Sequence, residues 1–154
     1  MFPSTVDRVP MSTAAEVNEQ IRQRTDANIR CYATASREAI TQRLSELDQE
    51  WDVERFLEAN AATAVMLGVT LGATVDRRFF FFPAVVGAFL LQHAVQGWCP
   101  PLPIIRRLGF RTAGEIEEER MALRILRGDF RESASAATHA VGERVEEVIA
   151  TVRQ

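Results

Sequence analysis

Two long runs without a charged residue constrain the fold of this chain more than any other feature. They cover residues 59–75 and 79–105, and only the segment 76–78, Asp-Arg-Arg, separates them. A helix rises 1.5 Å per residue, so spans of about 17 and 20 residues would reach about 25 Å and 30 Å, against a hydrocarbon core of about 30 Å. The sequence therefore predicts an all-α protein built on a two-span transmembrane helical hairpin over 59–105, with spans at about 59–75 and 79–98.

The charges of the chain are distributed unevenly around these runs. Residues 1–58, 59–111 and 112–154 carry formal charges of −4, +4 and −3, and every basic residue is an arginine. The basic excess lies against the apolar block, where anionic lipid headgroups would attract it. Acidic outer arms are unlike the basic surface that nucleic-acid binding requires. Membrane lipid is therefore an expected partner, and nucleic acid is not.

The residues before the first span are expected to form a helical arm. Residues 1–11 have no apolar core of the kind that a cleavable signal peptide needs, and we expect a disordered start there. Thr13 and Glu16 have the spacing of a capping box, which predicts a helix that begins near Ser12 or Thr13. The segment 12–58 is then an amphipathic cytoplasmic arm.

This arm carries an apolar stripe on an otherwise polar helix face. The stripe consists of Ile29, Ala33, Ile40, Leu44, Leu47 and Trp51. One straight helix from residue 13 to 58 would be about 69 Å long, so we expect either a coiled-coil partner or a break between Ser45 and Asp52. The stripe would pack on the chain's own other arm or form an intermolecular coiled coil.

Each span contains small residues on one face, which allow two helix backbones to approach closely in lipid. In the first span these are Gly68 and Gly72, which form a GxxxG pair. In the second span they are Pro83, Gly87, Ala94 and Gly97. Because the connection is so short, the two seams are expected to face each other, with Gly68, Gly72, Gly87, Ala94 and Gly97 as the packing residues.

Polar side chains of the second span suggest two further roles. Gln92 and Gln96 lie on the face opposite the small residues, where amides are costly in lipid, so we expect a subunit interface of a homodimer or other homo-oligomer there, or contact with water near the headgroups. His93 lies to one side of the seam. It is a candidate proton or ligand site, because ionisable residues inside a membrane are rare and often functional.

Arginine counts near the spans predict the orientation of the hairpin. The connecting loop holds Arg77 and Arg78, whereas the two flanks together hold Arg37, Arg43, Arg55, Arg106, Arg107, Arg111 and Arg120. We therefore expect both termini in the cytoplasm and the protein in the bacterial inner (cytoplasmic) membrane. Trp98, Arg106 and Arg107 are expected to be interfacial anchors.

The segment 106–154 is predicted to form C-terminal cytoplasmic helices. One helix should cover about 115–127 and stop at Gly128. A second should cover about 132–152, with an apolar stripe that could pack on the N-terminal arm.

The two cysteines predict no disulfide framework. Cys31 and Cys99 lie in different segments, without a Cys or His at metal-ligand spacing, so we expect reduced thiols, no metal and no cofactor.

The residues of the hairpin resemble a known family. The stretch 67–72, Leu-Gly-Val-Thr-Leu-Gly, the pair Phe79-Phe80, and Gly97-Trp98-Cys99 after the second span resemble the YgaP-like inner-membrane transmembrane domain, a domain of unknown function labelled DUF2892. The resemblance covers about residues 57–111. It implies an α-helical membrane hairpin, dimerisation, and Cys99 as the position of the family's cysteine after the span. Some members carry a rhodanese domain before the hairpin, whereas this chain has a helical arm there, so rhodanese activity is not implied.

Three functions compete. The first is a non-enzymatic oligomeric hairpin whose cytoplasmic helices scaffold protein partners, with a link to sulfur handling, since no pair of a nucleophile and a base is evident in the sequence. The second makes Cys99 a reactive thiol for sulfur transfer or redox sensing, favoured by nearby arginines. The third is an oligomeric small-solute transporter. A fourth reading, in which the hairpin is the buried core of a soluble bundle, stays open because runs of this length also occur in core helices.

Overall fold

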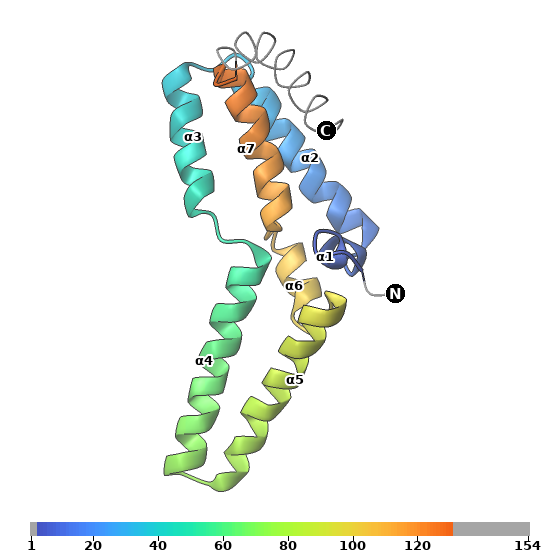
Figure 1. The fold of residues 1–154 in the computed structure, drawn as a ribbon, viewed down its shortest axis with the longest axis vertical. Coiled ribbons are helices and arrows are strands. Elements are labelled where there is room, and N and C mark those ends of the chain that lie inside the picture. Colours follow the sequence, from blue (N-terminus) through green and yellow to red (C-terminus); the bar gives the residue numbers. More distant parts are fainter. Residues whose placement is uncertain (1–2, 131–154) are drawn as a thin grey trace, which may run out of the picture.

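The computed structural model describes residues 3–130, and this part of the chain is helical without strands. The elements are α1 (Arg8–Met11), α2 (Ala15–Tyr32), α3 (Arg37–Gln49), α4 (Val53–Thr74), the 3-10 helix η1 (Arg77–Phe80), α5 (Phe81–Gln96), α6 (Leu102–Arg107) and α7 (Ala113–Arg127). In Figure 1, α4 and α5 extend together from one end of the molecule and meet at η1. Helices α2, α3 and α7 form the other end, with α1 and α6 between the two. The helix predicted over 132–152 lies outside the described residues.

The N-terminal arm consists of separate helices. The break expected between Ser45 and Asp52 is confirmed, because α3 ends at Gln49 and Asp52 caps the next helix by accepting a hydrogen bond from the Arg55 amide. A second break, between α2 and α3, was not predicted. There Ser36 caps α3 by accepting a bond from the Ala39 amide.

The start of the chain differs from expectation in two ways. Residues 8–11 are helical and Val9 is buried, although we expected disorder up to residue 11. Helix α2 begins at Ala15 without a side-chain cap, so the predicted capping box at Thr13 is wrong. The Thr13 hydroxyl instead donates to the Val9 carbonyl and accepts from Arg106, which leaves it unavailable to the helix.

The α3 part of the predicted apolar stripe packs within the chain, whereas Ala33 is exposed. Side chains of α3 meet those of α7 in one core cluster, which contains Ile40, Leu44, Leu47, Ile116 and Leu123. Helix α2 also contacts α7. Of the two expected arrangements, the structure has the packing on the chain's own C-terminal arm. Trp51, the last member of the predicted stripe, is instead exposed and stacks under the Arg55 guanidinium.

Helix α7 begins and ends close to its predicted limits. Thr112 and Glu115 form a capping box, and Gly128 ends the helix with a φ of 88°. Both ends of α7 are therefore marked by contacts between residues that are close in the sequence.

Two stretches are long and apolar enough to cross a membrane, one ending with α4 at Thr74 and one over Arg77–Gln96. Only 17% and 6% of their most apolar windows are buried within the protein. Large apolar side chains along both helices are therefore exposed, including Met66, Leu67, Phe81 and Leu91. This exposure differs from that of core helices in a soluble bundle, whose apolar residues would be mostly covered.

Helices α4 and α5 approach most closely near η1. A methyl group added at Gly68 would lie 2.5 Å from Cδ of Pro83, and one at Gly72 would lie 2.9 Å from the Phe80 ring. A methyl group at Gly87 would meet nothing within 4 Å. Of the predicted packing residues, Gly68 and Gly72 thus contact the facing helix or turn within the chain, whereas Gly87 does not.

Candidate functional site

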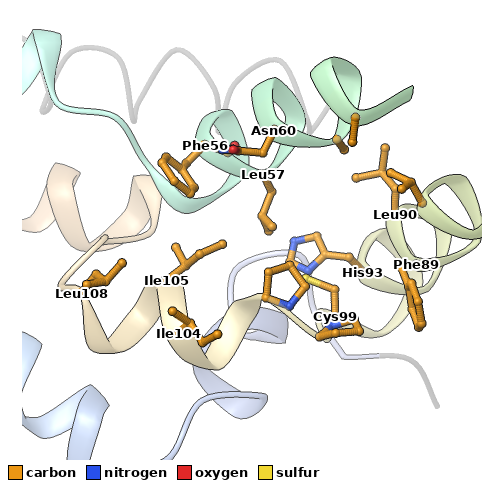
Figure 2. Close-up of a pocket in the computed structure, with 15 residues that line it drawn as sticks. Phe56, Leu57, Asn60, Phe89, Leu90, His93, Cys99, Ile104, Ile105 and Leu108 are labelled. Carbon is orange, nitrogen blue, oxygen red and sulfur yellow. The ribbon is translucent and has the colours of Figure 1, made fainter. Parts of the chain in front are cut away.

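An apolar pocket lies where α4 and α5 separate, at the end opposite η1 (Figure 2). Its volume is about 480 Å³, within the range of about 300–1,000 Å³ that is common for small-molecule sites. Helix α4 forms one wall, α5 the second, and the segment from Cys99 into α6 the third. The close approach at Gly68 and Gly72 holds the far ends of the two long helices together, and α6 fills part of the gap at their open end.

The lining of the pocket is almost wholly apolar. Its members include Phe56, Leu57, Ala64, Phe89, Leu90 and Ile105. The polar or ionisable side chains in it are Asn60, His93 and Cys99. The Asn60 amide donates to the Phe56 carbonyl at 2.7 Å and so has a partner on its own helix. The pocket reaches the protein surface, because Ile104 and Leu108 in its lining are 62% and 68% exposed.

His93 is the most buried ionisable group at the pocket, with 2% of the residue exposed. Its Nε2 lies 2.9 Å from a carboxylate oxygen of Glu54, and the other oxygen of Glu54 accepts from Arg8 Nη2 at 2.8 Å. A carboxylate can only accept, so Nε2 carries the hydrogen of this bond. In the neutral ring, Nδ1 then keeps a free lone pair, and it is a buried atom without a hydrogen-bond partner.

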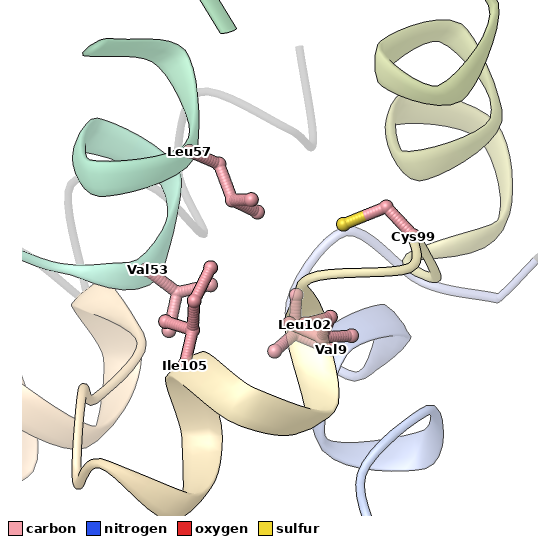
Figure 3. Close-up of a cluster of buried hydrophobic side chains, with 6 residues drawn as sticks. All are labelled: Val9, Val53, Leu57, Cys99, Leu102 and Ile105. Atoms are coloured by element: carbon pink, nitrogen blue, oxygen red, sulfur yellow. The ribbon is translucent and has the colours of Figure 1, made fainter. Parts of the chain in front are cut away.

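Cys99 lies beside the imidazole of His93 (Figure 2). The residue is 3% exposed, and Figure 3 shows its sulfur directed towards Leu57. It belongs to a buried cluster that also contains Val9, Val53, Leu57, Leu102 and Ile105. Glu54, His93 and Cys99 thus place a carboxylate, an imidazole and a thiol in sequence, and the last two of these side chains line the pocket. Cys31, by contrast, is exposed.

The turn at Gly97 places Cys99 next to His93. Gly97 ends α5 with a φ of 77°, a conformation that side chains disfavour. A methyl group there would lie 2.3 Å from the carbonyl oxygen of Arg8. Arg8 also donates to the carbonyl of Ala94 at 3.1 Å. Gly97 and Ala94, which we expected to pack the two spans together, therefore hold the N-terminal segment against the end of α5.

The predicted membrane anchors lie in different environments. Trp98 is 39% exposed and Arg107 is exposed, as an interfacial role requires. Arg106 is 1% exposed, and its guanidinium donates to both carboxylate oxygens of Glu115 at 2.7 Å and to Asn18. The prediction that Arg106 is an interfacial anchor is therefore wrong. Its guanidinium is paired inside the protein with Glu115 of α7 and Asn18 of α2 and does not face lipid headgroups.

The remaining predicted site residues, Gln92 and Gln96, lie near the end of α5. Gln92 is partly buried and Gln96 is exposed. The carbonyl of Gln96 accepts a bond from the Ser12 hydroxyl at 3.3 Å. The subunit interface at these two residues stays a prediction.

Sequence reasoning found two members of the site but not their relation. His93 and Cys99 were singled out separately, one as an ionisable residue in an apolar run and the other by family resemblance. Glu54 was missed, because it is 39 positions from His93 and lies in an arm rich in acids. The sequence signal for such a residue was His93 itself, because an imidazole in an apolar segment needs a hydrogen-bond partner when it is buried.

Within residues 3–130, no group of three or more His, Cys, Asp or Glu side chains could hold a metal ion. Comparison with family models, curated proteins and solved structures found no match to the chain. The resemblance to the YgaP-like membrane domain therefore stays a prediction.

Proposed function

We propose that this chain is a two-span membrane protein that binds the apolar part of a lipid-like molecule in the pocket between α4, α5 and α6. The observation that carries this proposal is the pocket itself. It is large enough for a small molecule, is lined mainly by apolar side chains, and opens at Ile104 and Leu108 onto the surface. Ligand sites of this kind combine an apolar lining with a few placed polar groups.

The proposed membrane location rests on the exposure of the two long helices. Their apolar side chains are uncovered within the protein, and lipid is the solvent that would cover them without a partner. The excess of arginine in the flanks favours an orientation with η1 outside and both termini in the cytoplasm. The pocket would then lie at the cytoplasmic end of the hairpin.

Lipid binding is favoured over the scaffolding role because the apolar side chains of α3, which could have bound a protein partner, are buried within the chain. Ile40, Leu44 and Leu47 pack against α7 and are not free to bind a second protein. Homo-oligomerisation through α4 and α5, a protein partner on the cytoplasmic helices, and solute transport stay predictions.

The pocket can be tested with a light-activated fatty acid. The full chain in lipid nanodiscs would be exposed to a palmitic acid that carries a diazirine, and the labelled residues would be identified by mass spectrometry. We expect saturable labelling of the pocket lining that unlabelled palmitic acid competes away.

A matched pair of substitutions on α4 provides the control. Ala64 lines the pocket, whereas Ala62 is exposed on the same helix outside it. Ala64→Phe should fill the space and reduce labelling at least about tenfold, because an overfilled site has no room for the ligand. Ala62→Phe should leave labelling unchanged. Labelling that does not saturate, or that responds equally to both variants, would rule the proposal out.

A further inference from the structure

The arrangement of Glu54, His93 and Cys99 has a chemical consequence beyond holding a ligand. A thiol reacts as a nucleophile when a base close to it takes its proton, and the base works best when a third group orients it. His93 has the free Nδ1 on the side of Cys99 and its Nε2 on Glu54. Arg8 holds the Glu54 carboxylate from the other side. The three side chains therefore match the roles of a nucleophile, a base and an orienting carboxylate.

The walls of the pocket limit which electrophile could reach this thiol. The side chains around Cys99, such as Leu57 and Ile105, are apolar, so an anionic polysulfide or persulfide donor would lose its hydration there without replacement. An acyl chain would replace water at those walls favourably. Its reactive carbonyl would lie at the polar wall.

We propose that Cys99 is an S-acylation site that accepts a long acyl chain from a thioester donor, with His93 as the base and the pocket as the binding site of the chain. This inference rests on the proposed function, since the same pocket must first hold the apolar chain. It extends that function from binding to a covalent step.

The step is a thioester exchange and needs no oxidant or reductant. The Cys99 thiol proton moves to Nδ1 of His93 as the sulfur forms a bond to the donor's carbonyl carbon. The carbon–sulfur bond of the donor then breaks, and the departing thiolate takes the proton back from Nδ1. The products are the acyl thioester of Cys99 and the free thiol of the donor. Glu54 stabilises the positively charged imidazole between the two proton transfers.

The experiment uses the full chain in nanodiscs with palmitoyl-coenzyme A as the donor. Intact mass and peptide mapping would follow the gain of one hydroxylamine-sensitive palmitoyl group. We expect modification of Cys99 and not of Cys31, which is more exposed but does not line this pocket. Acetyl-coenzyme A should react more slowly at Cys99, because a short chain fills little of the pocket. Equal modification of both cysteines, or equal rates for both donors, would overturn the proposal.

Substitutions separate the role of the base from that of the pocket. His93→Gln should slow palmitoylation of Cys99 about 100-fold, the usual effect of losing a general base. Circular dichroism of the variant would check that the protein is folded. A folded His93→Gln protein that is acylated at the wild-type rate would exclude the base.

Glu54 is a positioning residue, and its contribution can be measured in the same way. Glu54→Gln keeps an oxygen for Nε2 but removes the charge, so it should lower the rate of acylation while photolabelling stays constant. Glu54→Asp restores the charge and should recover part of the rate. Equal rates in the Gln and Asp variants would show that the carboxylate has no electrostatic role.

One further variant distinguishes the two proposals. Cys99→Ala keeps the pocket but lacks the thiol. If this variant is photolabelled while the wild-type chain is not acylated, the covalent step is refuted and the lipid-binding function stands. If neither protein is photolabelled, the proposed function itself fails.

Discussion

At the scale of single residues, Glu119 shows how the helices outside the hairpin are held together. Its side chain is fully buried and accepts hydrogen bonds from Arg43 on α3 and from Arg111. Arg111 also donates to both oxygens of Glu50 and to Thr25 on α2. Burial alone would raise the pKa of Glu119, but the bonds from Arg43 and Arg111 outweigh it and lower the pKa below its ordinary value of 4.5.

We expect Glu119→Gln to destabilise this helical unit by about 3 kcal/mol, because it removes the buried charge that Arg43 and Arg111 share and leaves them only the more exposed Glu46 and Glu50 as charged partners. Urea unfolding in detergent micelles, followed by circular dichroism, would measure the loss. Glu118→Gln, at an exposed position of α7, is the control and should change stability little.

The same carboxylate predicts a dependence of stability on pH. Since the pKa of Glu119 is lowered in the folded state, its contribution is complete above about pH 4.5 and is lost as the pH falls towards the folded value. The wild-type chain should therefore lose stability below pH 4.5 more steeply than Glu119→Gln. Parallel pH profiles for the two proteins would contradict the role of the ion pair.

At the scale of elements, the contact between α4 and α5 depends on two glycines near η1. Gly68 lies against Pro83, where a methyl group would come within 2.5 Å, whereas the space around Gly87 is open. Gly68→Ala should force the helices apart and cost about 1–3 kcal/mol, as overpacking does. Gly87→Ala should be neutral or slightly stabilising, because alanine favours a helix.

Unfolding of both variants by sodium dodecyl sulfate in mixed micelles would compare these effects. A loss for Gly87→Ala as large as that for Gly68→Ala would be inconsistent with the open space around Gly87 in a single chain. It would indicate instead that a second copy packs there, as the expected homo-oligomer requires.

At the scale of the whole molecule, the fold redistributes the basic charge that the sequence places beside the apolar runs. Arg106 and Arg111 are buried and paired with glutamates outside the helical hairpin. Arg77, Arg78 and Arg107 remain exposed and available to headgroups. The attraction to anionic lipid should therefore be weaker than the regional charge of +4 suggests.

Orientation in the membrane is a prediction at this same scale. Cys31 lies on the exposed surface of the arm, and Val75 is 68% exposed at the end of α4 beside η1. In spheroplasts, a membrane-impermeant maleimide should label Val75→Cys, made without the native cysteines, and should label Cys31 only after permeabilisation. The reverse pattern would place the termini outside, and labelling of both sites from outside would argue against two spans.

The local features of this fold were predictable from the sequence. The long runs without a charged residue predicted both apolar helices, because a helix with an apolar surface must be covered by lipid or by a protein core. Thr112 with Glu115, and Gly128, set the ends of α7 through bonds between near neighbours. Thr13 had the same local pattern as Thr112 but did not form a capping box, because its hydroxyl bonds to Val9 and Arg106.

The sequence by itself determined the helical class and the positions of the two apolar helices, because periodicity and charge act over a few residues, and it left the break before the first of them as one of two alternatives. Only the tertiary structure decided that Arg106 is buried and that Glu54 meets His93 beside Cys99. A buried charge is stable only next to a partner, and that partner is chosen by packing between helices that are distant in the chain.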